Sequence, residues 1–346
     1  MGGKHSVRSI LITADQASSA PGSNITGKIY MKFEKPVRAS TLWLKFKGKE
    51  LVYWSAGSMS AKAKGLTNLI NLKAAVMIWE NGEIPSGDYE IPYAYTLPEN
   101  LLNSFHLENP HYSADITYKL KVEIEPEKHK KIKNSVTVEI YNPVQAKEGI
   151  AISSNIPVGH CCSTRRFRIN AQLDKTAYSP LEKPQVSMEI NNSESGANLD
   201  WITLSLTRQI ILHSNKKHHT FFNEPIASHK VKGCGKGKIC EKESALITFL
   251  NLEKTQKTLH NAPTIKTGKI ECIYKLNLDF TSHDACVKNI GYCEIPIIIC
   301  PHIMEVPKPA PEAPPEWHPV TYDMQRLSYA YAEAYAPSAP PLEEDE

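Results

Sequence analysis

The chain has 346 residues, of which 41% are hydrophobic and 22% are charged. This length and apolar content suffice for two ordinary domains with their own cores, and they exclude a wholly disordered chain. No apolar run approaches the roughly 20 residues that a membrane-spanning helix needs, and the longest covers only residues 295–300. We therefore expect a cytoplasmic protein.

The formal net charge of +3 hides an uneven distribution along the chain. Residues 302–346 contain two basic and nine acidic residues, a net charge of −7, which leaves +10 on the first 301 residues. A basic body that is followed by an acidic tail indicates a body that meets anionic surfaces.

Alternation of apolar and polar residues dominates the sequence and predicts half-buried β-strands. Five such segments are residues 29–33, 42–46, 116–124, 186–190 and 202–206. Turn clusters rich in Gly, Pro, Asn and Ser separate them at the spacing of antiparallel sandwiches. For residues 59–77 we expect either one short helix or a long mobile loop. The fold class is therefore all-β.

The order of these features occurs twice, about 160 positions apart. Asp15 precedes Pro21 by six residues, and a turn and two predicted strands follow. Asp174 precedes Pro180 by the same interval, and two predicted strands follow again. This repeat predicts two copies of one β-sandwich, joined within residues 142–160.

Several segments of the chain resemble the arrestin family. In the first half these are residues 21–29, 42–50, 87–93, 96–105 and 116–120, of which Leu97-Pro98-Glu99-Asn100 with the following Leu101-Leu102-Asn103-Ser104-Phe105 is the most specific. In the second half they are Cys161-Cys162, residues 173–182, the Asn191-Asn192-Ser193 turn and residues 295–299. The resemblance covers about residues 5–301 and is to the α-arrestins, the arrestin-domain-containing trafficking adaptors, more than to receptor-desensitising arrestins.

The resemblance implies two tandem immunoglobulin-like arrestin β-sandwiches. We expect an N-terminal domain over residues 5–145, a C-terminal domain over residues 160–301, and a disordered Pro-rich acidic tail over residues 302–346. The implied function is a non-enzymatic adaptor in protein transport and endosomal sorting that binds the cytoplasmic tails of membrane-protein cargo. Two alternatives stay open: a coat subunit like the arrestin-fold component of retromer, and a phosphate-sensing arrestin that desensitises receptors.

The first six residues fit the M-G-x-x-x-[ST] pattern for N-myristoylation, with Gly2 as the acylated residue. One myristoyl chain binds membranes only marginally, so a second attraction is needed. Lys4 and Arg8 supply positive charge for an anionic membrane surface. The pattern predicts a protein that is peripheral on the plasma membrane or on endosomes.

The tail contains Pro337-Ser338-Ala339-Pro340, which matches the P-[ST]-A-P late-domain motif. This tetrapeptide resembles the ligand of the ubiquitin-conjugating-enzyme-variant (UEV) domain of the ESCRT machinery, and its prolines preform an extended segment for an aromatic-lined groove. Many α-arrestins also carry P-P-x-Y motifs. Here Pro314-Pro315-Glu316-Trp317 has Trp at the Tyr position, which argues against recruitment of a WW-domain ubiquitin ligase.

A second basic cluster lies between two predicted strands and consists of Lys128, Lys130, Lys131 and Lys133. We expect it either to contact anionic lipid head groups or phosphorylated cargo, or to be a solvated loop. The eight cysteines include Cys234-x5-Cys240 but no paired C-x2-C units, so we expect reduced thiols and no metal site. Without a phosphate-binding glycine loop, an RNA-binding aromatic strand or a catalytic motif, the sequence predicts no cofactor, no nucleic-acid partner and no enzymatic activity.

Overall fold

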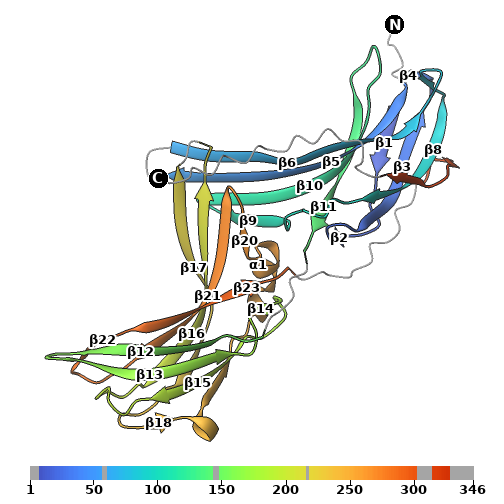
Figure 1. Ribbon diagram of the computed structural model, residues 1–346. Helices are drawn as coiled ribbons and strands as arrows, with labels where there is room; N and C mark the ends of the chain where they lie inside the picture. Colours follow the sequence, from blue (N-terminus) through green and yellow to red (C-terminus); the bar gives the residue numbers. More distant parts are fainter. Residues whose placement is uncertain (1–7, 57–60, 143–147, 216–217, 302–313, 328–346) are drawn as a thin grey trace, which may run out of the picture. The chain divides into compact units, whose positions relative to one another are not determined.

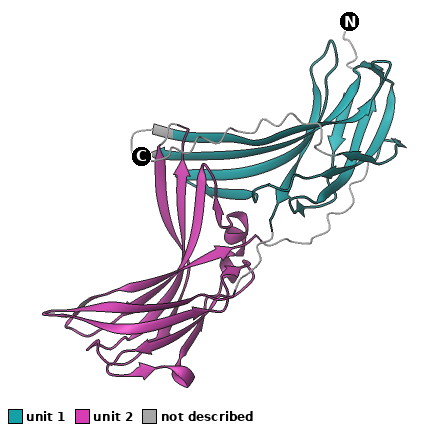
Figure 2. Ribbon diagram, viewed as in Figure 1, with its two compact units in different colours: residues 1–142, 303–346 teal, residues 143–302 magenta. Residues whose placement is uncertain are grey.

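A computed structural model of the chain describes residues 8–56, 61–142, 148–215, 218–301 and 314–327 (Figure 1). The chain forms two compact units, one from residues 1–142 and 303–346 and the other from residues 143–302 (Figure 2). Both units consist of packed β-sheets, which confirms the predicted all-β pair of sandwiches. Helical structure in the described residues is limited to α1 (Gln256–Asn261) and the 3-10 turns η1 (Lys242–Ser244) and η2 (Glu253–Thr255).

The first unit contains two main sheets. One sheet has the order β1 (Arg8–Ile12), β3 (Asn24–Phe33), β8 (Gly87–Thr96) and β24 (Val320–Thr321), and β25 (Gln325–Leu327) also pairs with β8. The other has the order β2 (Ser18–Ser19), β11 (Ile132–Ile140), β10 (Tyr112–Ile124), β5 (Thr41–Ala56) and β6 (Ala61–Ile78), with β9 (Phe105–Asn109) beside β10. The short strands β4 (Val37–Arg38) and β7 (Glu83–Ile84) form a separate pair.

The second unit also contains two main sheets. One has the order β18 (Ile239–Cys240), β15 (Gln185–Asn191), β13 (Thr164–Leu173), β12 (Ala151–His160) and β22 (Val287–Ile290), with β19 (Leu246–Phe249) beside β15. The other has the order β14 (Ala177–Tyr178), β23 (Tyr292–Ile299), β21 (Ile270–Thr281), β16 (Trp201–His213) and β17 (His219–Lys232), with β20 (Ile265–Lys266) beside β21.

The two units repeat one topology, as the spacing of Asp15 and Asp174 predicts. In the first unit the short strand β2 pairs in parallel with β11, and in the second unit β14 pairs in parallel with β23. Asp15 accepts a hydrogen bond from the Thr26 hydroxyl at 2.7 Å, and Asp174 accepts one from the Tyr178 hydroxyl at 2.5 Å. The internal repeat is therefore confirmed.

Strand β6 occupies the segment for which we expected a short helix or a loop, and both expectations are wrong. It pairs with β5 along its length, from Thr41 opposite Ile78 to Ala56 opposite Ala61. The register shifts twice, between Leu42 and Trp43 and between Gly48 and Lys49. Such irregularities interrupt the period of two, so tertiary pairing rather than local pattern makes this segment a strand.

Strand β12 lies within residues 142–160, where we expected only a connection. The second unit begins at residue 143, whereas we expected the C-terminal domain to begin at residue 160. Every second residue of β12 is exposed from Ala151 to Pro157, and its apolar side chains are few before Ile156. The apolar alternation was therefore too weak to identify the strand from the sequence.

Residues 314–327, which we name the tail strap, lie along β8 (red in Figure 1). Strands β24 and β25 pair with β8 in parallel, with Val320 opposite Tyr89 and Gln325 opposite Tyr93. The Tyr322 ring stacks on Tyr89 at a centroid distance of 5.8 Å. We expected no secondary structure in this region; the strap forms strands because its backbone pairs with the edge of β8.

Candidate functional site

The most distinctive chemical feature of the first unit is a row of lysines on one sheet face. Leu44 and Phe46 of β5 are fully buried, and side chains alternate along a strand, so the residues between them point away from the core. In the register, Lys47 lies opposite Lys119 of β10, and Lys45 lies opposite Lys121. We name this surface the lysine face; its members are Lys45, Lys47, Lys49, Lys119 and Lys121.

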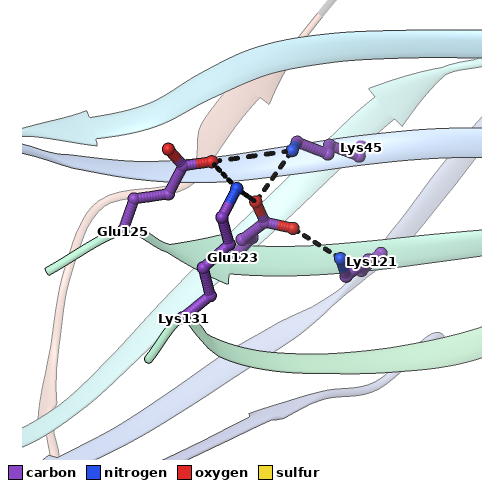
Figure 3. A network of polar contacts seen from close by, with 5 residues as sticks. All are labelled: Lys45, Lys121, Glu123, Glu125 and Lys131. Carbon is purple, nitrogen blue, oxygen red and sulfur yellow. Dashed lines mark hydrogen bonds and ion pairs between the residues drawn. The ribbon is translucent and has the colours of Figure 1, made fainter. Parts of the chain in front are cut away.

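A buried carboxylate neutralises one end of the lysine face. The Glu123 side chain is only 2% exposed, and its oxygens lie 2.5 Å from Lys121 Nζ and 2.9 Å from Lys45 Nζ (Figure 3). Burial by itself would raise the pKa of Glu123, but the hydrogen bonds from Lys121 and Lys45 outweigh it and hold the pKa well below its ordinary value. Glu123 is therefore ionised and compensates these two ammonium groups.

The other end of the lysine face has no such compensation. Within the described part of the chain, no carboxylate forms an ion pair with Lys47, Lys49 or Lys119. Burial lowers the pKa of Lys47, and the nearby positive charges of Lys121 and Lys45 lower it further. Like charges directly opposite each other destabilise a sheet, so this arrangement has an energetic cost that an anion would relieve.

A pocket of about 200 Å³ opens at this end of the lysine face and extends to Lys121. Its lining residues are Lys47, Lys49, Thr117, Lys119, Lys121 and Ser135. Ammonium groups and hydroxyls are hydrogen-bond donors for carboxylate and phosphate oxygens, and bonds to a charged acceptor are the stronger kind. The pocket can therefore bind an anionic group through several donors from three adjacent strands.

The predicted cluster at residues 128–133 belongs to the same sheet. Lys128 and Lys130 are exposed in the turn between β10 and β11, and Lys133 is exposed on β11 opposite Glu123. Lys131 differs, because its Nζ lies 3.2 Å from Glu123 and 2.7 Å from Glu125 (Figure 3). Hydrogen bonds to Glu125 and Glu123 raise the pKa of Lys131. Lys131 is therefore engaged within the protein, in contrast to its neighbours.

The side chains of the remaining predicted residues lie outside the part of the chain that the structure describes. Gly2, Lys4 and the motif Pro337-Ser338-Ala339-Pro340 lie outside the described residues. Of Arg8 only the backbone is described, at the start of β1 opposite Phe33. The described residues contain no group of three or more His, Cys, Asp or Glu side chains that could hold a metal ion, and no described helix is long and apolar enough to span a bilayer.

The sequence contains a signal for the lysine face, which we did not predict. Lysines alternate with apolar residues in Lys45-Phe46-Lys47 and again in Lys119-Leu120-Lys121. This alternation places each set on the outer face of its strand. The juxtaposition of the two sets follows only from the pairing of β5 with β10.

Comparison with known proteins agrees with this architecture. Residues 10–147 match the arrestin (or S-antigen) N-terminal domain, and residues 163–303 match the arrestin (or S-antigen) C-terminal domain. The two matches correspond to the two sandwich units, and together they cover most of the chain. The chain belongs to the arrestin family, whose members are generally non-enzymatic adaptors.

The chain is also similar to arrestin domain-containing protein 17 of Caenorhabditis elegans. The two are 25% identical over 210 residues, which cover 54% of this chain and 48% of the relative. The chain thus matches about half the length of that protein. This distant homology is to an arrestin of the α type, as the resemblance in the sequence implied.

Proposed function

We propose that the protein is a non-enzymatic adaptor in protein transport and endosomal sorting whose lysine face binds an acidic cytoplasmic segment of membrane-protein cargo. The observation that carries the proposal is the pocket around Lys47, Lys49 and Lys119, which have no acidic partner among the described residues. The family assignment supports the adaptor role, because arrestin-family proteins are generally non-enzymatic adaptors.

The shape of the site favours a discrete anionic group over a flat bilayer. The donors surround a pocket of about 200 Å³, and two of them are the hydroxyls of Thr117 and Ser135. A peptide side chain can place a carboxylate among these donors, whereas a planar membrane meets protruding groups first. The exposed turn with Lys128 and Lys130 is suited to contact the membrane, because an anionic membrane surface attracts each nearby lysine.

The two ends of the chain supply further contacts in this proposal. A myristoyl group on Gly2, assisted by Lys4 and Arg8, holds the protein on the cytoplasmic face of the plasma membrane or endosomes. Residues 337–340 recruit the UEV domain of the ESCRT machinery. Each contact is weak alone, and their linkage on one chain raises the overall affinity through effective concentration. Sequence motifs support these contacts.

Binding of a fluorescent Asp/Glu-rich peptide to the full chain, measured by anisotropy, tests the role of the lysine face. The double variant Lys47→Gln, Lys119→Gln should bind about tenfold or more weakly, because each lost charge-assisted hydrogen bond contributes on the order of 1.5–3 kcal/mol. The control is Lys254→Gln, Lys257→Gln, which removes the same charge from exposed positions of the second unit. Equal weakening in both double variants would contradict the proposal, since net charge alone would then explain binding.

The same pocket also favours a second candidate, a receptor-desensitising arrestin that senses phosphate. Ammonium and hydroxyl donors around one pocket suit a phosphate group as well as a carboxylate. A phosphorylated peptide and its Glu-substituted counterpart separate the two functions in the same assay. The adaptor predicts similar affinity for both peptides, whereas the desensitising arrestin predicts markedly tighter binding of the phosphorylated one.

A further inference from the structure

Two cysteines of the second unit are in contact: Cys234 lies in the loop after β17, and Cys240 lies in β18. The Cys240 thiol donates a hydrogen bond to the sulfur of Cys234, and the two sulfur atoms are 2.7 Å apart. Both residues are free cysteines. A disulfide bond is about 2.05 Å long, so the two sulfur atoms already lie close to bonding distance.

The backbone around this pair holds the two sulfurs in place. Asn192 is fully buried, and its side-chain nitrogen donates to the carbonyl oxygens of Cys234 and Gly235, each at 3.0 Å. The Asn192 backbone N–H donates to the Lys238 carbonyl at 2.9 Å, and the Lys238 N–H donates to Gly235 within the loop. Both halves of the loop are therefore anchored to one buried residue, and the contact between the thiols follows from the fold.

We propose that Cys234 and Cys240 are a modification site that closes to a reversible disulfide on exposure to a hydroperoxide. Cys240 is half-buried, whereas Cys234 is only 1% exposed, so the peroxide reaches Cys240 first. Burial, and secondly the hydrogen bond with Cys240, raise the pKa of Cys234 to about 12. Cys234 is therefore the thiol that reacts second.

The reaction balances with one peroxide for each disulfide. The Cys240 thiolate attacks one oxygen of hydrogen peroxide, the O–O bond breaks, and the released hydroxide takes up the thiol proton to leave as water. Cys240 is then a sulfenic acid. The Cys234 sulfur attacks the sulfenic sulfur, the S–S bond forms, and the sulfenic oxygen leaves with the Cys234 proton as a second water. Two thiols lose two electrons in total, and the peroxide gains them.

The disulfide would fix the loop that joins β17 to β18. This loop carries Lys236 and Lys238, and its tip at Gly237 has a positive φ of 73°. A covalent link between its two ends restricts the loop's excursions, so the amides of residues 235–239 should exchange with solvent more slowly after oxidation. Reduction should restore the original exchange rates.

Peptide mapping of the full chain tests this proposal directly. The protein is reduced, freed of reductant, treated with hydrogen peroxide, alkylated and digested with trypsin. Cleavage at lysines releases residues 233–236 and 239–242 as separate peptides, each with one cysteine of the pair. The expected product is these two peptides joined, two hydrogen masses lighter than their sum and separable by dithiothreitol.

Two variants test whether the joined product depends on this pair of cysteines. Cys240→Ser should abolish the joined product, and Cys162→Ser, at an exposed cysteine outside the pair, should leave it unchanged. The three exposed cysteines Cys161, Cys162 and Cys286 report the oxidant dose within the same sample. Oxidation of these cysteines without the joined peptides would overturn the proposal, as would Cys240 recovered as a sulfinic acid beside an alkylated Cys234.

Discussion

Glu123 shows how a single carboxylate shapes the electrostatics of the lysine face. It is 2% exposed and accepts hydrogen bonds from Lys45, Lys121 and Lys131. A buried charge is tolerated only when it is paired and hydrogen-bonded, and here three ammonium groups satisfy it. Glu123 thereby limits the uncompensated positive charge to the end of the face that carries the pocket.

We expect Glu123→Gln to lower the free energy of unfolding by about 2 kcal/mol at neutral pH, because three ammonium groups lose their charged acceptor. Urea unfolding measures this difference. Glu125→Gln is the matched control, since the Glu125 side chain is 44% exposed and its pairs are screened by solvent. A loss in the control as large as in Glu123→Gln would contradict the role given to the buried carboxylate.

The difference in the free energy of unfolding between the native chain and Glu123→Gln should depend on pH. The folded protein holds the pKa of Glu123 below its ordinary value of 4.5, so the stabilisation is complete above pH 4.5 and is lost as the pH falls toward the folded pKa. The stability gap between the native chain and Glu123→Gln should therefore narrow below pH 4.5. A gap that widens on acidification would contradict this explanation.

At the scale of elements, the tail strap covers the edge of β8. The Nζ atom of Lys32 lies over the Trp317 ring, 5.6 Å from the ring centroid, and the Tyr322 ring stacks on Tyr89. The Tyr322 N–H donates to the Glu90 carbonyl, and Leu327 is buried at the end of the strap. An uncovered sheet edge offers free N–H and C=O groups to other chains, and the strap pairs with this edge at residues 89–90 and 93–95 of β8.

Removal of both aromatic rings should loosen the strap. The double variant Trp317→Ala, Tyr322→Ala loses a stacked pair and a cation–π contact, each on the order of 1 kcal/mol, so the amides of β8 that face the strap should exchange about tenfold faster. Hydrogen exchange with mass spectrometry measures this, and Met324→Ala, an exposed position in the same segment, is the control. Unchanged protection of β8 in the double variant would show that the rings do not hold the strap.

The strands also differ in whether the sequence pattern predicts them. Strands such as β5 and β10 follow from alternation, because one face of each is buried and the other is solvated. The pattern of β6 is interrupted by two register shifts, and the strap has only two short strands, so neither has a local signal strong enough to identify it. The pocket depends on the order of β11, β10 and β5 within the sheet, which no local pattern contains.

For the whole molecule, the contrast between a body of charge +10 and a tail of −7 has a partial structural explanation. Part of the body's positive charge gathers on one sheet of the first unit, where Glu123 compensates one end and the pocket lies at the other. Part of the tail returns to the same unit through the strap. The adaptor proposal assigns cargo to the basic face and sorting machinery to the tail.

Capture by an immobilised UEV domain tests the role proposed for the tail. The full chain should be retained, and Pro337→Ala, Pro340→Ala should lose retention, because the two prolines preform the extended peptide that enters the groove. Pro307→Ala, Pro309→Ala is the matched control in the same Pro-rich region. Equal retention of all three proteins would refute recruitment through this motif.

Lysine acetylation footprinting of the full chain, with and without an Asp/Glu-rich peptide, tests whether the lysine face binds acidic peptides. Quantitative mass spectrometry gives the acetylation rate of each lysine in both conditions. We expect the peptide to protect Lys47, Lys49 and Lys119, while Lys254 and Lys257 of the second unit react at unchanged rates. Protection of lysines elsewhere, with unchanged reactivity at these three, would contradict it.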